Sequence, residues 1–161
     1  MKIGVISDTH IPERALDLPK EIYTAFKDCE LILHAGDLIS IDVLKSLEKI
    51  CPVTAVVGNM DSPEVRAKLK EKEVINVGNF KIGLIHGKGH PKNLLDVIKD
   101  AFNDRLDVIV FGHSHTPLNE KQEGTLYFNP GSPTDTMFSP YRSYGILEID
   151  NDIKGTIVKI S

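Results

Sequence analysis

Short, nearly continuous apolar runs alternate with amphipathic stretches through the first half of the chain. The apolar runs, which are typical of strands buried on both faces, lie at residues 2–7, 31–35 and 52–57. Helical patterns follow them at residues 19–27, 40–49 and 63–70. In the second helix, Ser40 is the expected N-cap, and Leu44 and Leu47 share one apolar face. This alternation predicts a parallel sheet with right-handed crossovers.

The pattern changes in the second half, where strands dominate. Gly78-Asn79 separates runs at 74–77 and 80–85 and predicts a hairpin. One more amphipathic helix is expected at 91–102, and the remaining strands at 107–111, 118–122, 125–128, 144–149 and 155–160. Residues 133–140 form the longest expected loop. Together, these expected helices and strands predict an α/β fold of two facing mixed β-sheets flanked by helices, forming a single domain over residues 1–161.

Composition and charge narrow the class of protein. The chain has 161 residues, of which 41% are hydrophobic and 26% charged, as in ordinary globular proteins. A net charge of -4 gives no strong nucleic-acid signal and no attraction to anionic membranes. No apolar run approaches membrane-spanning length, and the first residues predict a strand rather than a signal peptide. Cys29 and Cys51 form no disulfide framework, so a cytoplasmic location is expected.

Five of the apolar runs end abruptly in metal-type ligands. The endings are Asp8-Thr9-His10, Gly36-Asp37, Gly58-Asn59-Met60-Asp61, His86-Gly87 and Gly112-His113-Ser114-His115. Each motif alone is weak, but in open α/β sheets ligands bind beyond the carboxyl ends of the strands, where all five lie. Asp, Asn and His without Cys favour a hard or borderline metal such as Mn, Fe, Zn or Ni. A hydrolytic metalloenzyme is therefore the first hypothesis.

In this order, the five motifs resemble the signature of the calcineurin-like metallophosphoesterases. The short length and the segment Asn129-Pro130-Gly131-Ser132 make the chain most similar to the small YfcE-type phosphodiesterases, which are also relatives of a retromer scaffold subunit. The resemblance runs from Lys2 to about Ile149. It implies an αββα sandwich and a small phosphate-ester substrate, hydrolysed by metal-bound hydroxide at a dinuclear metal centre.

The resemblance also implies a metal-ligand set in this chain. Asp8, His10 and His115 match the ligands of a first metal, and Asn59, His86 and His113 match those of a second. Asp37 matches the carboxylate that bridges the two. Two divalent ions are expected, with Mn favoured over Ni, Fe, Zn or Co. None of the seven positions is substituted, which counts against a non-catalytic scaffold like the retromer subunit.

One position departs from the pattern of many larger members, which carry a histidine after the Asn of the third motif. Here that residue is Met60, which cannot protonate a leaving group, so activated phosphodiesters are expected to suit the site best. His90 is the candidate replacement, as an acid or as a phosphate contact. Asp61 is expected to orient its loop or a ligand histidine. A phosphomonoesterase or pyrophosphatase on the same site is the alternative activity, and a homo-oligomer is left open.

Three further positions are weaker candidates. His34, just before Gly36-Asp37, is interpreted as a core or supporting histidine. The segment 129–132 is either a tight turn or a source of backbone N–H groups for the site. Arg142 is interpreted as a solvated arginine rather than a phosphate ligand. Ser7, Ser114 and Ser132 are expected to be structural, because the metal mechanism needs no protein nucleophile.

Overall fold

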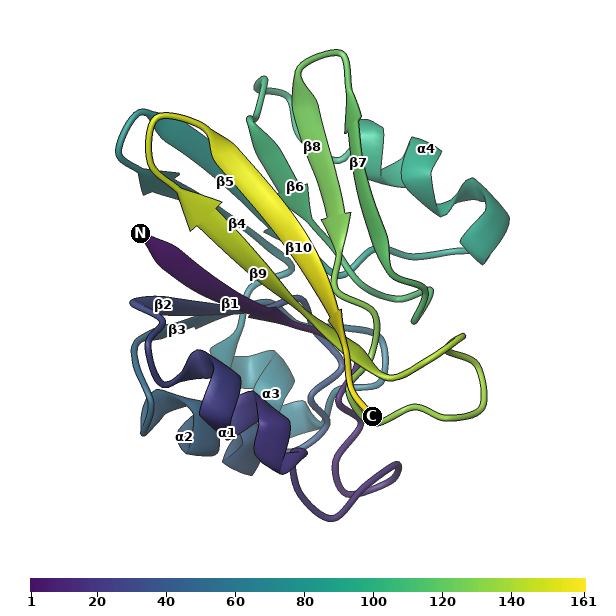
Figure 1. Cartoon of the computed structure of the whole chain (residues 1–161). Helices are drawn as coiled ribbons and strands as arrows, with labels where there is room; N and C mark the ends of the chain where they lie inside the picture. The colour runs from purple at the N-terminus through teal and green to yellow at the C-terminus, as the bar shows by residue number, and fades with distance from the viewer.

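The first of two β-sheets is built mostly from the N-terminal half of the chain. The computed structural model describes residues 1–161, and this sheet has the strand order β10-β9-β1-β2-β3 (Figure 1). Its strands are β1 (Lys2–Ile6), β2 (Leu31–His34), β3 (Val53–Ala55), β9 (Ser143–Ile149) and β10 (Ile153–Lys159). β1, β2 and β3 are parallel, whereas β9 pairs antiparallel with both β1 and β10. The predicted parallel strands are therefore confirmed.

The second sheet is built from the middle of the chain and has the order β4-β5-β6-β8-β7. Its strands are β4 (Lys72–Val77), β5 (Phe80–Ile85), β6 (Val108–Val110), β7 (Leu118–Gln122) and β8 (Thr125–Asn129). β5, β6 and β8 are parallel, and an antiparallel hairpin closes each edge. The hairpin predicted at Gly78-Asn79 is the turn between β4 and β5.

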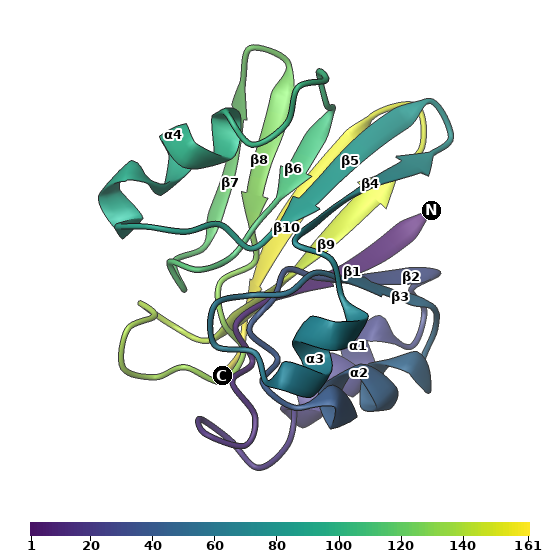
Figure 2. The same cartoon turned by 180° about the vertical axis from the view of Figure 1, so that it is seen from behind.

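Helices cover the outer faces of both sheets. The helices α1 (Lys20–Phe26), α2 (Ile41–Glu48) and α3 (Pro63–Lys68) lie against the first sheet, and α4 (Leu94–Lys99) lies against the second (Figures 1 and 2). One apolar core fills the space between the sheets, and one lies beneath each helical layer. This is the αββα sandwich that the sequence predicted. None of the helices combines the length and apolar composition that crossing a bilayer requires.

Aromatic rings that pack over glycines determine how closely neighbouring layers of the fold approach each other. Phe128 of β8 is fully buried between the sheets, and its ring lies over Gly145 and Gly155 of the opposite sheet. A Cβ atom at Gly145 would lie only 2.3 Å from this ring. Phe26 of α1 fills the space over Gly4 of β1 in the same way. Interiors are close-packed, so these ring-over-glycine contacts fix the spacing of the layers.

One predicted helix is shorter than expected. Residues 91–102 were expected to be continuously helical, but the segment divides into a 3-10 turn (Pro91–Asn93) and α4. Asn93, at φ -105° and ψ 2°, is the last residue of the 3-10 turn and the N-cap residue of α4. Phe102 instead packs against the backbone of Gly83 in the second sheet. The predicted cap at Ser40 is confirmed, since its hydroxyl accepts a hydrogen bond from the Asp42 N–H at 3.2 Å.

Candidate metal centre

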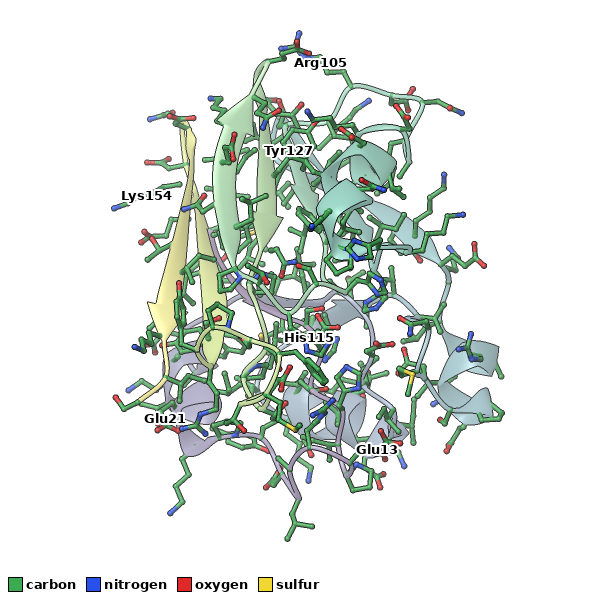
Figure 3. The ribbon with its side chains drawn as sticks, turned by 90° about the vertical axis from the view of Figure 1, so that its right-hand side faces the viewer. Glu13, Glu21, Arg105, His115, Tyr127 and Lys154 are labelled. Carbon is green, nitrogen blue, oxygen red and sulfur yellow. The ribbon has the colours of Figure 1, made fainter.

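The carboxyl ends of the parallel strands of both sheets meet at one edge of the molecule. Figure 3 looks onto this edge, with His115 near its centre at the junction of the sheets. The loops after β1 and β2 run side by side there, because the Asp8 N–H donates to the Gly36 carbonyl and the His10 N–H donates to the Asp37 carbonyl, both at 3.0 Å. Across the sheet junction, the His113 N–H donates to Oδ2 of Asp8 at 3.1 Å.

Five of the site residues have left-handed backbone conformations. Their φ values are 54° for Asp8, 44° for His10, 57° for Asp37, 69° for His113 and 57° for His115. Such conformations cost about 1–3 kcal/mol each for non-glycine residues and persist only where surrounding contacts enforce them. Aspartate and histidine tolerate them better than most residues. The backbone conformations of these five residues therefore cost folding free energy, and they direct the side chains toward the site.

Asp61 holds the loops that carry Asp37 and Gly58. Its buried carboxylate accepts hydrogen bonds from the backbone N–H groups of Ile39 and Gly58, both at 2.7 Å, and of Asp37 at 3.1 Å. Ile39 is β-branched and lies at φ 72°, so without this hydrogen bond its conformation would be unfavourable. Burial raises the pKa of Asp61, and the backbone donors oppose that rise. Its hydrogen bonds join the loop after β2 to the loop after β3.

Asp8 and Asp37 each have one oxygen fixed by the protein and one left facing the site. In Asp8, Oδ2 accepts from the Ser7 hydroxyl at 2.8 Å and from the His113 N–H. In Asp37, Oδ1 accepts from the Met60 N–H at 2.7 Å. The remaining oxygens, Oδ1 of Asp8 and Oδ2 of Asp37, point among the histidines. Oδ1 of Asp8 is buried and has no hydrogen-bond partner at all.

The histidines are oriented so that a ring nitrogen faces these oxygens. Nε2 of His10 lies 3.4 Å from Oδ2 of Asp37, and it is buried without a hydrogen-bond partner. Nε2 of His86 lies 3.3 Å from the same oxygen, and Nε2 of His115 lies 3.3 Å from Oδ1 of Asp8. Two groups of three ligand atoms result, Asp8–His10–His115 and Asp8–Asp37–His86.

Asn59 joins the second group through its amide oxygen. Nδ1 of His86 lies 2.7 Å from the Ala35 carbonyl and must be its donor, which leaves Nε2 to face Oδ1 of Asn59 at 3.0 Å. Likewise Nε2 of His113 donates to the Gly89 carbonyl at 2.8 Å, which leaves Nδ1 3.2 Å from the same amide oxygen. Unprotonated nitrogens and an amide oxygen are all acceptors, so this cluster requires a proton or a cation between its members.

The carboxylates beside His86 and His115 favour the protonated form of these two histidines. Burial lowers the pKa of His86, but its ion pairs with Asp37 and Asp8 outweigh burial and raise that pKa to about 9. The pKa of His115 rises to about 9 because its ion pairs with Asp8 and Asp135 likewise outweigh burial. Burial raises the pKa of Asp8, but the neighbouring histidines hold it well below its ordinary value. A metal must therefore displace histidine protons.

These donors fit divalent metal ions. Carboxylate oxygens, an amide oxygen and imidazole nitrogens converge from both sheets, and two buried donor atoms lack any protein partner. This is a ligand set for Mn, Fe, Ni, Zn or Co. The structure thus brings together the side chains of all seven residues expected as ligands, which are Asp8, His10, Asp37, Asn59, His86, His113 and His115.

Asp135 contributes to the site and was not singled out from the sequence. Its carboxylate accepts from Nδ1 of His115, which fixes the ring so that Nε2 faces Asp8. Arg14 lies 3.8 Å from the other oxygen of Asp135 and stacks on the ring of Phe138. Asp135 lies in the loop predicted at residues 133–140, where no strand end marks it. Its only sequence signal is its position soon after Asn129-Pro130-Gly131-Ser132.

The weaker candidates lie around this cluster rather than in it. His34 is buried, and burial lowers its pKa to about 3, so it is a neutral supporting residue that accepts from the Gly36 N–H. His90 is exposed, and its side chain caps the 3-10 turn by accepting from the Lys92 N–H. The Ser132 hydroxyl donates to the Asp8 carbonyl at 2.8 Å and supports the loop. Arg142 donates to the main-chain oxygen of Ser161.

Comparison with known proteins assigns this arrangement to a family. Residues 1–152 match the model of the calcineurin-like phosphoesterase superfamily domain. The chain is 43% identical, over 83% of its length and 78% of the relative's, to a probable metallophosphoesterase of Methanothermobacter thermautotrophicus. It is 31% identical, over 81% and 83%, to a phosphodiesterase of Methanocaldococcus jannaschii.

A solved structure of a metal complex shares the fold. Wild-type Vps29 of Entamoeba histolytica, complexed with Zn²⁺, superposes with a TM-score of 0.76 at 27% identity, over 99% of both chains. The family match spans the strands that carry every candidate ligand, and the fold agrees with it in both sheets. The chain therefore belongs to the calcineurin-like phosphoesterase superfamily.

Proposed function

We propose that this protein is a metal-dependent phosphodiesterase with a dinuclear centre. In this proposal, Asp8, His10 and His115 hold one divalent ion, Asn59, His86 and His113 hold the other, and Asp37 bridges them. Manganese is the favoured metal, and Ni, Fe, Zn and Co suit the same donors. The names of the M. jannaschii phosphodiesterase and of the Zn²⁺ complex of Vps29 support the activity and the metal.

One observation carries the proposal of two metals rather than one. Oδ2 of Asp37 lies 3.4 Å from Nε2 of His10 and 3.3 Å from Nε2 of His86, although these histidines belong to different ligand groups. A single carboxylate oxygen between two sets of donors is the arrangement that a bridging ligand needs. The Met60 N–H holds the other oxygen of Asp37 and so fixes the orientation of the carboxylate.

When bound, the two ions would polarise the phosphoryl oxygens and lower the pKa of a water molecule to near neutrality. The hydroxyls of Ser7 and Ser132 are not available as nucleophiles, because both are buried and donate to Asp8. Met60 contributes its N–H to the site, but its half-exposed side chain carries no proton for a leaving group. Esters with good leaving groups are therefore the preferred substrates.

His90 remains our candidate proton donor or phosphate contact. The preceding residue, Gly89, accepts a hydrogen bond from His113 through its carbonyl, so the loop of His90 is tied to a ligand. If His90 protonates the leaving group, His90→Gln should slow esters of poor leaving groups more than aryl esters. Equal slowing of both ester types would rule out this role.

A comparison of two aryl phosphates tests the function. Purified protein loaded with Mn²⁺ or Ni²⁺ should hydrolyse bis(p-nitrophenyl) phosphate faster than p-nitrophenyl phosphate. A clear preference for the monoester with every metal would refute diesterase activity and favour the phosphomonoesterase alternative. Asp37→Ala should abolish activity and two-metal loading, whereas the exposed Asp42→Ala on α2 serves as the matched control. Full loading of Asp37→Ala by elemental analysis would contradict the bridging role.

A further inference from the structure

A cavity adjoins the metal centre on the side of Asn59 and His86. It has a volume of about 620 Å³ and is lined by residues of both halves of the fold, including these two ligands. Small-molecule sites typically occupy about 300–1,000 Å³. One wall comes from the end of β3 and from α3, and the other from the end of β5 and from α4. Figure 2 shows α3 and α4 on the two opposing layers that provide these walls.

Four apolar side chains form part of the cavity wall, and two of its three basic residues donate to backbone carbonyls. Apolar contact comes from Val57, Ile85, Val97 and Ala101. Arg66 donates to the carbonyls of Asn59, at 2.6 Å, and Asp61, at 3.0 Å. Lys72 donates to the Ala101 carbonyl at 2.8 Å and also lies over the ring of Phe102. Arg66 and Lys72 therefore build the walls and do not supply protons to a departing alkoxide.

The remaining charged groups favour an uncharged occupant. Lys88, Glu71 and Asp100 are exposed lining residues that form no ion pair, so the cavity has unpaired charges of both signs. The lining charges nearly balance, because Arg66, Lys72 and Lys88 line the cavity together with Glu71 and Asp100, so no strong field of one sign draws a charged group into the cavity. These groups offer hydrogen-bond partners to the polar edges of an organic group whose faces contact the apolar side chains.

We infer that this cavity binds the ester group that phosphorus keeps during hydrolysis, and that this group is an uncharged, ring-containing alcohol of nucleoside size. The inference rests on the proposed phosphodiesterase function and names its substrate class. A monoester has no such second group, so the cavity would also give the site its preference for diesters. Asn59 and His86 line both the cavity and the metal centre, so the bound group and the phosphorus are held next to each other.

Two diesters with the same leaving group test this inference. Thymidine 5′-(p-nitrophenyl phosphate) and methyl p-nitrophenyl phosphate both release p-nitrophenolate, so their kcat/KM values differ only through the group that stays on phosphorus. We expect the metal-loaded protein to prefer the thymidine ester by at least about tenfold, which a hydrophobic pocket achieves even for a single methylene. Equal kcat/KM values for the two esters would overturn the inference.

Variants that fill the cavity test whether the cavity causes the preference for the thymidine ester. Val97→Trp, and independently Ala101→Phe, should bring the preference for the thymidine ester close to unity. Val74→Trp, at an exposed position of β4 outside the cavity, should retain the preference. Retention of the preference in both cavity variants would overturn the inference, and their folding is checked by thermal unfolding.

A binding measurement distinguishes failure of this inference from failure of the proposed function. If neither ester is hydrolysed with any metal, the phosphodiesterase proposal fails. Binding of thymidine 5′-phosphate to the metal-loaded protein, measured by calorimetry, then decides the cavity's role. Binding that Val97→Trp abolishes and Val74→Trp preserves would support the cavity as the nucleoside site. Absence of binding to the unaltered protein, or equal binding by Val97→Trp, would overturn it.

Discussion

The substitution Asp61→Asn tests whether one carboxylate holds the strained metal-binding loops in place. Oδ2 of Asp61 accepts from the N–H groups of Asp37 and Gly58, and Oδ1 accepts from that of Ile39. An asparagine has the same shape but only one acceptor oxygen. Its amide group must therefore face at least one of these N–H donors.

The magnitude follows from the donor that is left without a partner. A buried N–H that loses its acceptor costs about 1–3 kcal/mol. If the amide oxygen takes the Oδ2 position, Ile39 is the residue that loses its hydrogen bond, at a φ of 72° that costs energy in itself. A loss of ~2 kcal/mol in unfolding free energy corresponds to a fall of about 4–8 °C in Tm for a chain of this size.

Urea unfolding with and without Mn²⁺ measures both effects of Asp61→Asn. Mn²⁺ affinity should fall more than stability does, because mutating groups that orient ligands typically costs about 10–100-fold in metal affinity. Asp107→Asn is the matched control, since that carboxylate accepts one backbone N–H, from Lys81 at 2.8 Å, away from the metal centre. A wild-type unfolding free energy and a wild-type Mn²⁺ affinity in Asp61→Asn would refute the loop-holding role.

Three other predictions concern the metal ligands. Asp135→Asn should weaken metal binding by about 10–100-fold, because it loosens the ring of His115; an unchanged affinity in chelator competition would contradict this. Without metal, the raised pKa values of His86 and His115 contribute stability that is complete below pH ~6.5 and lost as pH rises through about 9. Urea unfolding in chelator across this range should therefore show falling stability, and a flat profile would exclude protonation of these histidines. Gly58→Ala should lower activity by about a hundredfold, because its Cβ would lie 2.1 Å from Oδ1 of Asp37; the rate of bis(p-nitrophenyl) phosphate hydrolysis measures this, and a wild-type rate would disprove it.

The ligand positions are visible in the sequence because they follow apolar strands directly. Parallel strands bring their carboxyl ends to one edge, so Asp8, Asp37 and His86 could be expected to lie together before the fold was known. The two sheets were predictable for the same reason, since most of their strands have an apolar run. The hairpin at Gly78-Asn79 added a local turn signal.

The supporting contacts could not be predicted in the same way. Asp135 reaches His115 only because of the path of an irregular loop, and no periodicity marks such a path. The left-handed conformation of Ile39 is set by contact with Asp61 and runs against the residue's own preference.

The ring of Phe128 between the sheets has a consequence for the distant metal centre. Asp8, His10, Asp37 and Asn59 follow strands of one sheet, whereas His86, His113 and His115 follow strands of the other. The distance between the sheets, which Phe128 sets against Gly145, therefore also sets the distance between the two halves of the ligand set. Bound ions would cross-link the two sheets. The packing of the core between the sheets would therefore determine which ionic radius the site accommodates best.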